Sequence, residues 1–77
     1  MTLQEIQAAI EEHGDNFVQI TFLNGTNIRC VLRDAYLAHP NDPRGYTEPY
    51  FYVTRIDVDQ NPIEKFNCSE VQEIEAI

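Results

Sequence analysis

The sequence predicts an α+β fold in which an N-terminal amphipathic helix precedes a small, strongly bent and barrel-like antiparallel sheet of four to five strands. Three observations support this class. Apolar residues first recur at helical spacing, apolar and polar residues then alternate in several short segments, and Asn24-Gly25 marks a hairpin between two of these segments. Because 77 residues are enough for one small core, we expect a single domain over residues 1–77.

The helix is predicted over residues 2–13. Thr2 and Glu5 have the spacing of a capping box, in which each side chain accepts a hydrogen bond from a backbone N–H at the start of the helix. Gly14 suits the end of the helix because glycine adopts a positive φ without strain. One face of the helix is apolar and carries Leu3, Ile6, Ala9 and Ile10. We therefore expect the helix to cover one end of the sheet.

The predicted strands span residues 16–23, 27–38, 50–58, 63–68 and 71–75. We expect a type I′ turn at Asn24-Gly25, because both residues tolerate a positive φ. The third strand is the clearest, since it is rich in aromatic and β-branched residues. The spacing by three of Val71, Ile74 and Ile77 fits either a last strand or one helical turn. A flat sheet of this size leaves its edges exposed, which favours curling into a barrel.

Residues 39–49 connect the second and third predicted strands and hold three of the four prolines. A connection of this length is longer than most in compact domains, so we expect it to be either functional or mobile. The sequence leaves open whether this loop is ordered before a partner binds.

The hairpin pattern resembles the first motif of the Sm-like small β-barrel family. Its residues here are Val18, Ile20, Phe22, Asn24-Gly25, Ile28 and Leu32, and Val71 and Ile74 are similar to the apolar pair in the last strand of that family. The resemblance implies an N-terminal helix, five bent strands, and rings or dimers formed through edge strands. It does not extend to RNA binding. The second glycine of the family falls on Cys30, its uridine-binding Asp and Asn have no match near residues 34–38, and its second motif is absent.

The composition excludes several classes of function. The chain has 13 Asp and Glu against 5 Lys and Arg, a formal net charge of −8, which argues against non-specific nucleic-acid binding. No apolar run is long enough for a membrane helix, so we expect no membrane association. Cys30 and Cys68 form neither a disulfide framework nor a metal-ligand pattern, and we interpret them as reduced core residues of a cytoplasmic protein.

The sequence shows no catalytic, cofactor or metal site. Ser69 is the only serine and lacks the glycine elbow of a nucleophile, and the three glycines form no phosphate-binding loop. His39 has no second ligand at metal-binding spacing. We therefore expect a protein that is not an enzyme.

The first candidate site is an acidic face near the C-terminus. It comprises Asp57, Asp59, Glu64, Glu70, Glu73 and Glu75. A field of one sign steers association with an oppositely charged surface, so these residues predict docking on a basic protein partner. Small acidic phage-encoded inhibitors and nucleic-acid mimics are similar in size and charge. The simpler alternative is that the carboxylates only face solvent.

The second candidate site is the middle of the chain, which concentrates arginine and tyrosine. It comprises Arg29, Arg33, Arg44, Tyr46, Tyr50, Tyr52 and Arg55. These residue types suit an interface between subunits, or an RNA or nucleotide site in which rings stack on bases and arginines hold phosphates. The simpler alternative is that the tyrosines pack on the sheet and the arginines pair with neighbouring carboxylates. The sequence leaves open whether the chain forms a homo-oligomer.

Overall fold

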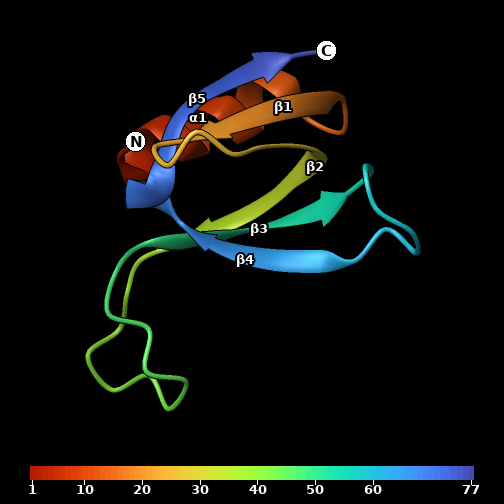
Figure 1. Cartoon of the computed structure of the whole chain (residues 1–77). Coiled ribbons are helices and arrows are strands. Elements are labelled where there is room, and N and C mark those ends of the chain that lie inside the picture. The colour runs from red at the N-terminus through yellow and green to blue at the C-terminus, as the bar shows by residue number, and fades with distance from the viewer.

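The computed structural model describes all 77 residues and contains one helix followed by a five-stranded antiparallel sheet (Figure 1). The elements are α1 (Leu3–His13), β1 (Phe17–Phe22), β2 (Asn27–Tyr36), β3 (Tyr50–Arg55), β4 (Ile63–Asn67), a 3-10 turn η1 (Cys68–Glu70) and β5 (Val71–Ala76). The predicted α+β class is thus confirmed. The last segment is a strand and not a helical turn. With 11 residues, α1 is too short to cross a membrane, and it is the only α-helix.

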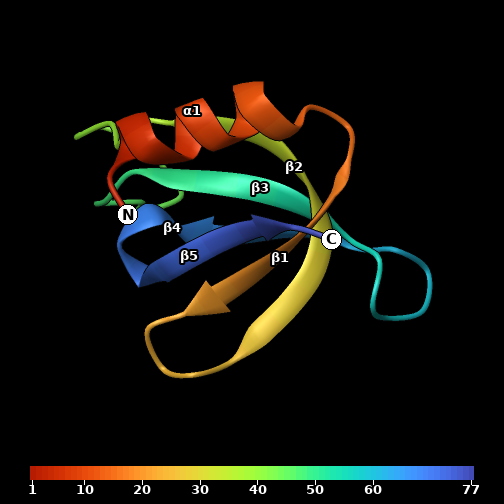
Figure 2. The same cartoon turned by 90° about the horizontal axis from the view of Figure 1, so that it is seen from above.

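The sheet is strongly bent but stays open. Its strand order is β4-β3-β2-β1-β5, so β4 and β5 form the two edges. Figure 1 shows β1 and β5 above β3 and β4, and Figure 2 shows that β2 curves between these two halves. The expected closure into a barrel does not occur. No backbone hydrogen bonds join β4 to β1 or β5 on the open side of the sheet. Side chains make the contact there instead, since the rings of Phe66 on β4 and Phe22 on β1 lie 4.9 Å apart.

The start of α1 has the predicted capping box. The Thr2 hydroxyl accepts a hydrogen bond from the Glu5 N–H at 3.2 Å, and the Glu5 carboxylate accepts one from the Thr2 N–H at 2.9 Å. The hydrogen bond from the Thr2 backbone lowers the pKa of Glu5. At the other end, Gly14 has a φ of 54° and donates its N–H to the Ile10 carbonyl. The face of α1 that carries its buried residues packs on β2. Figure 2 shows the ribbon of α1 along one side of the sheet.

One core fills the space inside the bend. It combines the apolar face of α1 with inward-facing residues of the strands, and its fully buried members include Phe51, Val53 and Ile20. Both cysteines belong to this core and are free thiols. Burial disfavours the thiolate and raises the pKa of Cys30 to about 12. The two thiols are therefore core residues, as the sequence predicted, and are not reactive groups.

The β1–β2 turn differs from the predicted type I′ turn. Gly25 has a φ of 89°, but Asn24 does not adopt a positive φ. The Gly25 N–H instead donates to the Phe22 carbonyl at 2.9 Å, and the Asn24 side-chain oxygen accepts a hydrogen bond from the Thr26 N–H at 2.9 Å. The loop has three residues, Leu23–Gly25, and not the two of a type I′ turn. Hairpins with a three-residue loop need a positive φ at one position only, and here that position is Gly25.

The third strand ends at Arg55 and does not reach residue 58 as predicted. The reason is Asp57, whose carboxylate accepts hydrogen bonds from the Arg29 N–H at 3.2 Å and from the Arg55 guanidinium at 2.7 Å. These contacts turn the chain out of the sheet just after β3.

We predict that Phe51→Ala destabilises the protein by about 3–5 kcal/mol, because it leaves a cavity in the core. That is a large part of the stability of a small domain, so the variant is expected to be largely unfolded. The matched control is Phe17→Ala, since Phe17 is 55% exposed on the outer face of β1. Urea unfolding followed by circular dichroism measures both. Equal effects of the two substitutions would contradict the assignment of the core.

Candidate functional site

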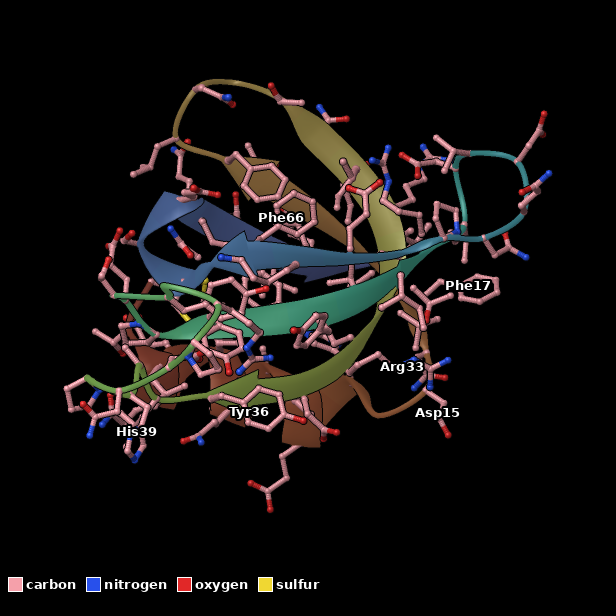
Figure 3. The ribbon with its side chains drawn as sticks, turned by 90° about the horizontal axis from the view of Figure 1, so that it is seen from below. Asp15, Phe17, Arg33, Tyr36, His39 and Phe66 are labelled. Carbon is pink, nitrogen blue, oxygen red and sulfur yellow. The ribbon has the colours of Figure 1, made fainter.

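The loop after β2 folds against the outer face of β3 and β4 (Figure 3). The rings of the four tyrosines meet at this face. We call this the tyrosine cluster: Tyr36, Tyr46, Tyr50 and Tyr52 with Arg44 and Lys65. The ring centroids of Tyr46 and Tyr50 lie 4.7 Å apart, and those of Tyr36 and Tyr50 lie 5.4 Å apart. Tilted and edge-on rings at such distances add a favourable interaction energy to the free energy gained by burying their surface.

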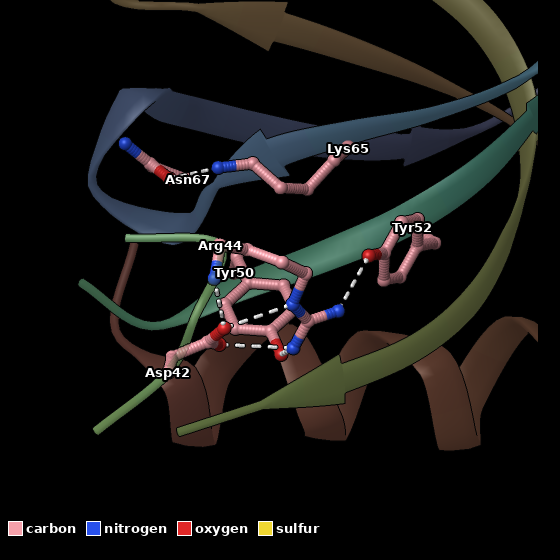
Figure 4. Close-up of polar contacts among 6 residues, drawn as sticks. All are labelled: Asp42, Arg44, Tyr50, Tyr52, Lys65 and Asn67. Atoms are coloured by element: carbon pink, nitrogen blue, oxygen red, sulfur yellow. Dashed lines mark hydrogen bonds and ion pairs between the residues drawn. The ribbon is translucent and has the colours of Figure 1, made fainter. Parts of the chain in front are cut away.

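Arg44 is the centre of the tyrosine cluster (Figure 4). Its Nε and Nη2 donate to the two carboxylate oxygens of Asp42 at 3.0 and 2.9 Å. Its Nη2 also donates to the Tyr50 hydroxyl at 2.8 Å, and its guanidinium lies 4.5 Å from the centre of the Tyr46 ring. The hydrogen bonds from Arg44 lower the pKa of Asp42. The guanidinium fork therefore already holds a carboxylate of its own loop.

Lys65 joins the tyrosine cluster from β4. The strand register places it opposite Tyr52, and its Nζ lies 4.1 Å from the centre of the Tyr46 ring. It also donates to the Asn67 side-chain oxygen at 3.1 Å. Lys65, Tyr36 and Asp42 also contribute to this site, although the predicted arginine and tyrosine set does not include them. The spacing of Asp42 and Arg44 in a loop was the one local signal for their ion pair.

The other three arginines do not join the tyrosine cluster. Arg55 binds Asp57 at 2.7 Å and Glu64 at 3.3 Å. The Arg33 Nε donates to the Thr54 hydroxyl at 2.9 Å, and Arg29 lies exposed on β2. The predicted arginine and tyrosine set is thus divided. Tyr46, Tyr50 and Tyr52 come together around one arginine, while the remaining arginines are distributed along β2 and β3.

The predicted acidic face is also divided. Asp57 and Glu64 share Arg55, and Asp59 lies in the turn between β3 and β4. The remaining three, Glu70, Glu73 and Glu75, follow one another along η1 and β5 and take part in no ion pair. We call these three the β5 carboxylates.

Glu73 and Glu75 lie on the same face of an edge strand. The register pairs them with Thr21 and Gln19 of β1, so no cation lies opposite either carboxylate. A hydrogen bond and charge repulsion from Glu75 raise the pKa of Glu73. Two neighbouring carboxylates therefore repel each other here, and neither takes part in an ion pair.

Comparison with known protein families, with characterised proteins and with solved structures finds no match to this chain. The resemblance to Sm-like barrels therefore stays a prediction.

We predict that Arg44→Lys loosens the loop over residues 37–49. Lysine keeps the charge, but it cannot hold Asp42 with two parallel hydrogen bonds while contacting a tyrosine hydroxyl. Hydrogen exchange measured by mass spectrometry should then become several-fold faster in the loop and stay unchanged in β1. Arg29→Lys is the control, because the Arg29 side chain makes no hydrogen bond or ion pair. Unchanged exchange in the loop would show that Arg44 does not hold it.

We predict that Asp57 contributes to the loss of stability in acid. The hydrogen bonds from Arg55 lower the pKa of Asp57 from its usual 3.8 to about 2. A lowered pKa stabilises the folded state above the usual pKa, and that contribution disappears as the pH falls from about 4 to about 2. The urea midpoint of Asp57→Asn should therefore change less over this pH range than that of the parent protein. Asp59→Asn is the control and should keep the parental pH dependence.

Proposed function

We propose that this protein is a small non-enzymatic binding module that docks on a basic surface of a protein partner. The observation that carries the proposal is the pair Glu73 and Glu75, two exposed carboxylates that repel each other on an edge strand and take part in no ion pair. A Lys or Arg of a partner would relieve this repulsion. The proposal thus explains why the molecule leaves these charges uncompensated.

The position of the β5 carboxylates supports this function. β5 pairs only with β1, so the backbone groups along its other edge have no partner strand. The net charge of −8 adds a long-range attraction that speeds the encounter with a basic surface. Charged contacts of this kind favour specificity and rapid association over high affinity.

The tyrosine cluster supports the alternative function less well. To bind a phosphate of RNA or of a nucleotide, Arg44 would have to release Asp42, which it holds through two hydrogen bonds. The net negative charge of the protein also opposes the approach of phosphates. The contacts of Arg44 instead fasten the loop to β3, which is a structural role.

The proposal includes a cytoplasmic location and an inhibitory mode of action. The two buried free thiols favour a reducing compartment. In the inhibitory mode the β5 carboxylates would occupy a site where the partner otherwise holds phosphates, as in a phage-type inhibitor or nucleic-acid mimic. This part of the proposal rests on the size and charge of the chain.

The test compares two double variants with the same net charge. Glu73→Lys with Glu75→Lys reverses the charges on β5, and Glu11→Lys with Glu12→Lys reverses two exposed charges on α1. A partner captured on the immobilised protein is identified, purified and titrated against both variants at low and high salt. We expect the β5 variant to bind roughly tenfold more weakly or worse, since close charge pairs across interfaces contribute on the order of 1.5 kcal/mol or more.

The helix variant should keep most of the affinity, and the binding of the parent protein should weaken with added salt. Equal weakening by the two variants would show that only the overall charge matters. Binding that neither variant nor salt affects would contradict docking through carboxylates.

A further inference from the structure

The open side of the sheet holds a groove between the β1–β2 hairpin and β4, with a volume of about 460 Å³. This is within the size range of pockets that bind small ligands or large side chains. The residues that line it include Phe22, Leu23, Ile28, Arg55, Phe66 and Glu70. Figure 3 shows Phe66 in the space between β4 and the hairpin.

The groove is apolar because the sheet does not close there. Phe66 is only half-buried, although its ring lies 4.9 Å from that of Phe22 and 6.1 Å from that of Phe51. Leu23 lies at the hairpin turn and is 68% exposed. The core thus extends to the surface at this place, and an apolar side chain in the groove would remove this surface from water.

The charges around the groove are mainly negative. Arg55 is the one cation, and it already binds the carboxylates of Asp57 and Glu64. Glu70 lines the groove and takes part in no ion pair. An anionic ligand would therefore be repelled, while a cation beside the groove would gain a partner in Glu70.

The negative charge of the protein decides whether a second copy of this chain or a segment of another protein occupies the groove. A second copy of this chain also carries a net charge of −8, so two copies repel each other. A segment that is both apolar and basic fits the groove and its surroundings. We propose that the groove takes a Leu or Phe side chain from a basic segment of the protein partner, with a neighbouring Lys or Arg paired to Glu70. This inference rests on the proposed function and adds the apolar contact that carboxylates alone do not provide.

The probe is a synthetic peptide, Gly-Lys-Lys-Leu-Phe-Lys-Lys-Gly, acetylated and amidated at its ends. One control peptide has Ser-Ser in place of Leu-Phe, and a second has Glu in place of every Lys. Binding is followed by two-dimensional NMR of the labelled full chain. We expect the Leu-Phe peptide to bind roughly tenfold more tightly than the Ser-Ser peptide, because it buries apolar side chains, with shifts at Leu23, Phe66 and Glu70.

The variants test the two halves of the proposal. Leu23→Ser should weaken binding of the Leu-Phe peptide several-fold, and its control is Leu37→Ser, since Leu37 is 71% exposed in the loop away from the groove. Glu70→Gln should also weaken binding, and Glu12→Gln on α1 is its control. Both Leu23 and Glu70 are exposed, so these variants are expected to fold.

Each other outcome overturns the proposal in a defined way. Equal binding of the Leu-Phe and Ser-Ser peptides, with shifts confined to Glu73 and Glu75, would disprove the groove and leave the proposed function intact. Equal binding of the Lys and Glu peptides would disprove the basic occupant. A concentration-dependent dimer that Leu23→Ser abolishes would identify a second copy as the occupant. No binding of either basic peptide at about 1 mM would overturn the groove proposal, whereas the proposed function is tested separately by the titrations of the β5 and helix variants.

Discussion

The short link between β4 and β5 is the constraint on which the rest of this structure depends. These strands form opposite edges of a five-stranded sheet, which in a flat sheet would lie about 19 Å apart. Three residues, Cys68–Glu70, connect them. A link of this length reaches about 14 Å when fully extended and less as a 3-10 turn. The sheet therefore has to bend, and the bend encloses the core. The amino group of Met1 reinforces this crossing, since it donates to the carbonyls of Cys68 and Val71.

The bend brings the edges together at η1 but does not pair them along their length. Leu23 of the hairpin donates its N–H to the Glu70 carbonyl at 2.9 Å, which fixes the hairpin at the crossing. Further along, the rings of Phe22 and Phe66 contact each other across the gap and line the groove that remains there. One topological constraint thus accounts for the enclosed core, for the two free edge strands, and for the apolar groove on the open side.

The bent, open sheet also determines which charged side chains are paired inside the molecule and which face solvent. Two arginines form ion pairs within the molecule. Arg44 binds Asp42 and fastens the long loop, and Arg55 binds Asp57 in the turn after β3. Since five basic residues face 13 acidic ones, most carboxylates have no partner of their own. Those on the edge strand β5 are left facing solvent. The surface that the protein offers to other molecules is therefore acidic, with one apolar groove.

The sequence by itself determined the features that depend on near neighbours along the chain. The capping box of Thr2 and Glu5 and the alternation in β1 and β2 are local patterns, and they predicted the helix and the strands to within a few residues. Only the tertiary structure decided which distant residues meet. Cross-strand register places Lys65 beside the tyrosines, and a shift by one residue would have turned it to the other face. Whether the sheet closes, and whether Glu64 of β4 pairs with Arg55 of β3, likewise depend on contacts between segments that the local pattern does not specify.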